Sequence, residues 1–224
     1  MSQVIYWANL SEFSSESMTP KPLLKDLANS QSEHKGGNWV ACPAISTKHK
    51  NTFLTTFPRS VEVNFKEKPI SQDNLIVERT GLYENSYAFE WDIKRIFFSA
   101  EPQILEVSPA FLHRTSYVKY GHTPSGAFNI GGWFRPSFPT MQLWSGENYF
   151  SAEKGEPHLY YNFPNSERVI LKEFSMTDNL YNVMHDCVNY KKYKPGQTLN
   201  TMYEDFYKEG LQAFTLSEIQ KSLH

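Results

Sequence analysis

Alternation of apolar and polar residues over residues 1–174 predicts many short strands. Residues 51–57 and 60–65 each alternate, and Val61, Val63 and Phe65 share one face of the second segment. A period of two residues is typical of half-buried strands. Residues 158–163 and 168–174 repeat the pattern on either side of a Pro-Asn-Ser-Glu turn, which favours a hairpin. We therefore predict a β-rich body.

The pattern changes to a helical period after residue 174. Ser175 and Asp178 have the spacing of a capping box, and apolar residues follow at helical intervals up to Val188. A second helix is expected from about residue 199 to 209, with Gly210 as its end, because glycine commonly terminates helices. A third is expected to open at a capping box over residues 215–218. A short helix is also expected near Thr19.

The stretch over residues 126–174 is the densest in aromatic and turn residues, and we expect it to nucleate the β core. Its Gly131-Gly132 pair interrupts a possible strand over residues 127–134, which indicates a bulge or a close backbone approach. Aromatic residues form 15% of the chain, and they favour strands.

These patterns together predict an α+β fold in one domain over residues 1–224. We expect a mainly antiparallel, aromatic-rich β-sandwich or distorted barrel over about residues 1–174. Two or three helices over about residues 175–224 are expected to pack on it. The chain has 224 residues, which is enough for one large core.

Composition excludes several classes of partner. The formal charge of −2 argues against non-specific binding to nucleic acid or to an anionic membrane. No apolar run approaches the length of a membrane-spanning helix, and the first residues lack the pattern of a secretory signal. No pair of the seven histidines has metal-ligand spacing, and no phosphate-binding glycine motif is present. We therefore expect neither a metal nor a cofactor.

Two groups of residues are candidates for catalysis. Cys42 ends a short apolar run before a proline, so it could be a nucleophile in a pocket wall or an ordinary thiol at a sheet edge. Cys187 lies on the apolar face of its predicted helix, which indicates a buried structural role. Glu153 and Glu156 flank a turn before His158, and such a group could carry out acid–base chemistry or form a solvated turn.

Trp133, Phe134 and Arg135 are candidates for binding, because aromatic and guanidinium groups together anchor many interfaces. The alternative is that the two rings straddle a sheet, one inward and one outward, while Arg135 forms a surface ion pair.

Several of these segments carry a resemblance to uncharacterised proteins of tailed bacteriophages. The matching segments are Tyr6-Trp7-Ala8, Ala41-Cys42-Pro43-Ala44, Lys50-Asn51-Thr52-Phe53, Phe97-Phe98-Ser99, Ile130-Gly131-Gly132-Trp133-Phe134-Arg135-Pro136 and Glu153-Lys154-Gly155-Glu156-Pro157. The resemblance implies a viral protein in the host cytoplasm or the virion and implies no particular activity.

A second likeness is to the dUTPase-like β fold. Residues 126–129 followed by Gly132-Trp133, and residues 154–156 before an apolar strand, are similar to its arrangement. Asn129 stands where that family would carry its water-activating aspartate, so nucleotide hydrolysis is not expected.

Two functional hypotheses follow. The first is a non-enzymatic structural or host-interaction protein that acts through a surface, either on a protein partner or by self-association. The second is a small-molecule or nucleotide-binding enzyme with a pocket near Cys42, Trp133, Arg135 and His158. Convergence of these four side chains in one cleft would favour the enzyme.

Overall fold

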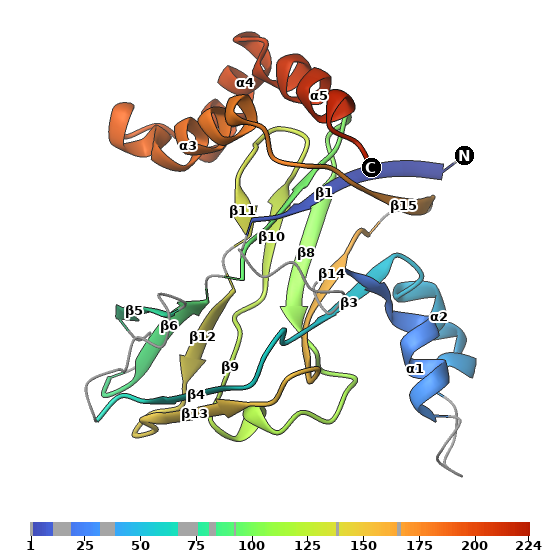
Figure 1. Ribbon diagram of the computed structural model, residues 1–224, viewed down its shortest axis with the longest axis vertical. Coiled ribbons are helices and arrows are strands. Elements are labelled where there is room, and N and C mark those ends of the chain that lie inside the picture. Colours follow the sequence, from blue (N-terminus) through green and yellow to red (C-terminus); the bar gives the residue numbers. More distant parts are fainter. Residues whose placement is uncertain are drawn as a thin grey trace.

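The computed structural model describes residues 2–10, 19–31, 39–66, 76–80, 84–91, 93–137, 139–164 and 167–224. Most of its strands belong to three sheets with four or five strands each (Figure 1). The first, called the β1 sheet, has the order β11 (Pro136–Ser137), β7 (Arg95–Phe98), β1 (Ser2–Asn9) and β15 (Arg168–Glu173). The second, called the β8 sheet, has the order β10 (Gly126–Asn129), β8 (Ile104–Pro109), β14 (Pro157–Asn162), β3 (Thr52–Thr56) and β2 (Lys21–Pro22).

The third sheet lies at the far end of the molecule from the C-terminal helices (Figure 1). Its order is β5 (Ile76–Thr80), β6 (Tyr87–Trp91), β12 (Thr140–Leu143) and β9 (Gly121–His122), and β4 (Val61–Asn64) pairs separately with β13 (Tyr149–Ala152). Among the described strands, only β1 and β15 pair in parallel, and no closed barrel forms. The predicted α+β class with mainly antiparallel pairing is confirmed.

The β1 and β8 sheets share one hydrophobic cluster. On β8, Leu105 and Val107 are buried in it, whereas Ile104 and Glu106 are exposed. Phe97 of β7 packs against Tyr161 of β14, with ring centroids 4.8 Å apart. Period-two alternation therefore divides each strand between this cluster and the opposite face.

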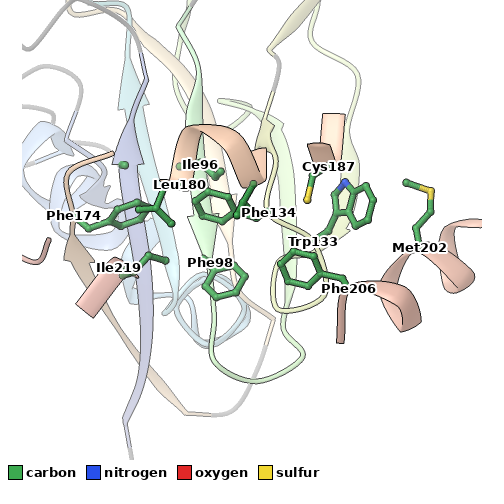
Figure 2. Packing of buried hydrophobic residues seen from close by; sticks show 12 residues of the cluster. Ile96, Phe98, Trp133, Phe134, Phe174, Leu180, Cys187, Met202, Phe206 and Ile219 are labelled. Carbon is green, nitrogen blue, oxygen red and sulfur yellow. The ribbon is translucent and has the colours of Figure 1, made fainter. Parts of the chain in front are cut away.

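The other face of the β1 sheet is covered by three C-terminal helices, α3 (Asp178–Tyr193), α4 (Leu199–Lys208) and α5 (Leu211–Lys221). Ile96 and Phe98, the neighbours of Phe97 on β7, point into the cluster beneath these helices (Figure 2). Leu180 of α3 and Phe206 of α4 fill the same cluster. The prediction of helices packed on a β body is confirmed.

The helix boundaries differ in two places from those the capping patterns predict. The Thr177 side chain, rather than that of Ser175, caps α3 by accepting a hydrogen bond from the Leu180 amide at 3.2 Å. Thr215 lies inside α5, because Gly210 adopts φ 73° and both ends α4 and opens α5. A left-handed glycine needs no side-chain cap to reverse the chain direction.

Two further helices, α1 (Leu23–Gln31) and α2 (Pro43–Lys48), lie beside the β8 sheet (Figure 1). Leu23 and Leu27 of α1 pack on Leu54 and Tyr160 at the outer face of this sheet. The first helix begins later than Thr19 because Lys21–Pro22 pair with β3. Short 3-10 turns occupy Trp39–Ala41 (η2) and Tyr117–Lys119 (η3). No described helix is long and apolar enough to cross a membrane.

Candidate functional site

Trp133 and Arg135 line one groove, at the edge where β10 and β11 end the two packed sheets. The groove has a volume of about 270 Å³. Besides the segment over residues 129–137, the lining includes Phe97 and Leu105 from β7 and β8, Ala127 and Phe128 from β10, Lys191 from the end of α3, and Leu199 and Tyr203 from α4. Most of this lining is apolar, which is typical of binding clefts.

The loop between β10 and β11 brings Trp133 to this place. The Asn129 side-chain oxygen accepts hydrogen bonds from the amides of Gly131 at 3.1 Å and Gly132 at 3.2 Å. A Cβ atom on Gly131 would lie 2.2 Å from the Glu101 carbonyl oxygen. Of the two alternatives predicted for the glycine pair, a bulge or a close backbone approach, the close approach is present at Gly131, and Asn129 has a structural role in the turn.

Gly131→Ala is expected to lower the free energy of unfolding by about 2 kcal/mol, because the new methyl group collides with backbone atoms that cannot rotate away. Urea denaturation measures this change. Gly126→Ala is the matched control, because a Cβ there meets only the Phe128 side chain, at 3.4 Å or more. Equal stability of the two variants would contradict the close approach.

A polar contact between α3 and α4 fixes the helical wall of the groove. The Tyr190 hydroxyl donates a hydrogen bond to the Asp205 carboxylate, and Lys194 Nζ lies 3.0 Å from the same oxygen. Both bonds hold the pKa of Asp205 below its ordinary value. The Tyr190 ring also contacts Trp133 edge-on, with centroids 5.4 Å apart. Trp133 is thereby buried between the sheet edge and the helices.

The charges at the groove are of one sign. Arg135 and Lys191 line it and are exposed, and no Asp or Glu occurs among its lining residues. An apolar surface beside two cations is complementary to an apolar ligand that carries negative charge.

Phe134 lies outside the groove, in the cluster beneath the C-terminal helices (Figure 2). Its side chain is fully buried and packs edge-on against Phe98, with centroids 5.5 Å apart. The alternative interpretation placed one ring inward and one outward, but both Trp133 and Phe134 are buried. The third member, Arg135, is exposed.

His158 and Glu156 do not form an acid–base pair at the mouth of a hairpin. His158 is completely buried and stacks on Phe57 with ring centroids 4.2 Å apart. Burial, followed by the positive charge of Arg95, lowers the pKa of His158 to about 3. Glu156 instead accepts hydrogen bonds from the amide and hydroxyl of Ser116 and from the Glu153 amide. It fastens a turn.

The two cysteines are free, and one is exposed whereas the other is buried. Cys42 is exposed at the start of α2, and no described side chain is hydrogen-bonded or ion-paired to its thiol. Cys42 is not among the residues that line the groove, and α2, which it precedes, lies on the other side of the molecule's β8 sheet from α3 and α4 (Figure 1). Cys187 is buried, as its helical position predicted, and burial raises the pKa of its thiol to about 12.

A second pocket, on the outer face of the β8 sheet, contains none of the candidates. It has a volume of about 430 Å³ and includes His49, Thr52, Glu106 and Asn162. Thr52 and Asn162 are polar but buried on adjacent strands. The sequence signal is weak, because isolated polar residues in apolar strands become informative only once their pairing is known.

Within the described part of the chain, no group of three or more His, Cys, Asp or Glu side chains could hold a metal ion. Comparisons with protein-family models, curated proteins and solved structures found no match to this chain.

Proposed function

We propose that this is a non-enzymatic phage protein that acts by docking an extended segment of a partner protein along β10. The segment it takes combines apolar residues with at least one acidic residue. The phage origin in this proposal rests on the sequence resemblance, and the docking mode rests on the groove.

The observation that carries the proposal is the position of the groove against a sheet edge. Among the described strands, β10 pairs only with β8, so its other edge faces away from the β8 sheet. Ala127 and Phe128 of this strand are both exposed and both line the groove. Edge strands bind extended peptides by main-chain hydrogen bonds, while neighbouring pockets take alternate side chains.

The remaining lining supports the choice of side chains. Leu199 is 49% exposed and Phe128 is 38% exposed, so both would lose water-accessible apolar area when an apolar side chain enters. Arg135 and Lys191 would face a carboxylate on the same segment.

The four residues of the enzyme hypothesis do not converge in one pocket. Trp133 and Arg135 share the groove, whereas Cys42 is on the surface beside α2 and His158 is in the core. Four residues in three environments cannot act on one substrate, so binding is the better interpretation.

The test is selection from a library of short randomised peptides, followed by calorimetric titration of the enriched peptide. We expect enrichment of acidic residues next to large apolar residues. The double variant Arg135→Glu with Lys191→Glu is expected to bind the peptide at least roughly tenfold more weakly, a loss of about 1.4 kcal/mol.

Lys192→Glu is the matched control. It reverses a charge next to Lys191 on α3 but does not line the groove, so peptide affinity should change little. Enrichment of basic peptides, or wild-type affinity in the double variant, would refute the proposal.

A further inference from the structure

The second pocket is built around a chain of four hydrogen-bonded side chains. His49 Nδ1 lies 3.2 Å from Thr52 Oγ1, and the Thr52 hydroxyl donates to Asn162 Oδ1 at 2.9 Å. Asn162 Nδ2 then donates to Glu106 Oε2 at 2.7 Å. His49 is 4% exposed and Thr52 is 2% exposed. Burial of three of the four side chains, with Glu106 exposed at the end of the chain, holds His49, Thr52 and Asn162 in one orientation.

The chain defines the tautomer of His49. Because the Thr52 hydroxyl donates its proton to Asn162, it accepts a hydrogen bond from Nδ1 of His49, which therefore carries the proton. Nε2 is then a bare acceptor, and the structure gives it no hydrogen-bond partner among the described residues. Burial and the neighbouring Lys48 lower the pKa of His49, which keeps the ring neutral.

An exposed aromatic ring lies over the same pocket. Phe111 is 57% exposed. Its ring contacts the Tyr160 ring edge-on at 5.3 Å and the His49 ring at 5.8 Å. Lys48, Ser108 and Ser125 add further polar groups to the lining. The pocket thus offers acceptors, donors and an apolar ring face within one concave surface.

We propose that this pocket binds a pyranose sugar. Each sugar hydroxyl both donates and accepts hydrogen bonds, and the pocket provides partners for both roles. Glu106 and His49 Nε2 accept, Lys48 donates, and Ser108 can do either. The C–H face of a pyranose ring would lie against Phe111. A volume of about 430 Å³ accommodates one or two sugar residues.

This site is independent of the β10 groove. Leu105 lines the groove on one face of the β8 sheet, whereas Glu106 lines the sugar pocket on the other. Ala127 of the edge strand borders both. A failure to detect peptide binding would therefore not contradict the proposed sugar site. A failure to detect sugar binding would likewise not contradict the proposed peptide groove.

The experiment uses the full chain and saturation-transfer NMR with a panel of probes. The probes are methyl glucoside, methyl galactoside, methyl mannoside and N-acetylglucosamine, with adenosine and uridine as competing ligand classes. We expect at least one pyranoside to bind. Phe111→Ala is expected to weaken it roughly tenfold, since the ring face contributes about 1.4 kcal/mol.

Two further variants separate binding from folding. Glu106→Gln keeps a side-chain oxygen that accepts a hydrogen bond from Asn162 but removes the negative charge. This variant should therefore retain the fold and bind the sugar more weakly. Tyr193→Ala removes an aromatic side chain of similar exposure, 63%, on α3, and should leave sugar binding unchanged.

Absence of binding by every pyranoside would overturn the proposal, and so would binding of a nucleoside in their place. Equal affinity of the wild type and Phe111→Ala would overturn it as well.

Discussion

Phe134→Ala is expected to lower the free energy of unfolding by about 4 kcal/mol, the usual cost of removing a buried phenyl ring. The Phe134 ring is fully buried between β7 and the C-terminal helices, in contact with Phe98 and Phe174 (Figure 2). Its removal leaves a cavity where the helices meet the sheet. Urea denaturation followed by circular dichroism measures the change.

Phe128→Ala is the matched control for this substitution. Phe128 lies on β10, just before the loop that carries Phe134, but its ring is 38% exposed and lines the groove. We expect Phe128→Ala to lower the free energy of unfolding by less than about 1 kcal/mol. Its main effect should be weaker binding of the selected peptide. An unchanged free energy of unfolding in Phe134→Ala would contradict the described packing of the C-terminal helices on the β1 sheet.

Acid is expected to destabilise the protein through His158. The ordinary histidine pKa of 6.5 applies when the chain is unfolded, whereas burial lowers the pKa of folded His158 to about 3. Below pH 6.5 the unfolded chain therefore binds a proton that the folded protein does not. The stabilisation from neutral His158 is complete above pH 6.5 and is progressively lost down to pH 3.

Between pH 7 and pH 4.5 this single residue is expected to remove roughly 2 to 3 kcal/mol of folding free energy. The measurement compares urea denaturation of the wild type and of His158→Phe across this range. The variant should lack this component, while carboxylates with lowered pKa values, such as Asp205 and Glu218, contribute to both proteins alike. Parallel pH profiles would show that His158 titrates normally in the folded state.

The local pattern was sufficient for much of the fold. Alternation located β3, β4, β14 and β15, and helical periodicity located α3 and α4 near their observed bounds. The predicted hairpin of β14 and β15 was wrong, because the two strands belong to different sheets. Both signals depend on neighbours within a few residues of each other, which is why they can be read from the chain alone. The sequence pattern did not distinguish which residue caps α3, because Ser175 and Thr177 both have side chains that can accept a hydrogen bond from a helix amide.

The candidate site was predicted only in part. Of the three binding candidates, Trp133 and Arg135 line the same groove, whereas Phe134 between them is buried in the cluster beneath the helices. The assignment of Cys42 and His158 to that pocket did not agree with the structure, because their distances from it depend on how the sheets pack. His158 was a candidate at the mouth of a hairpin, next to the turn flanked by Glu153 and Glu156, and it instead lies in the core.

By itself, the sequence determined the α+β class, the order of many elements, and the interruption of regular pairing at the Gly131-Gly132 pair. Only the tertiary structure decided which aromatic rings are buried and that the groove needs α4. It alone joined His49, Thr52, Glu106 and Asn162 into one hydrogen-bonded chain. The physical reason is that propensity and periodicity act between near neighbours, whereas a site is made by residues that sheet pairing brings together from distant parts of the chain.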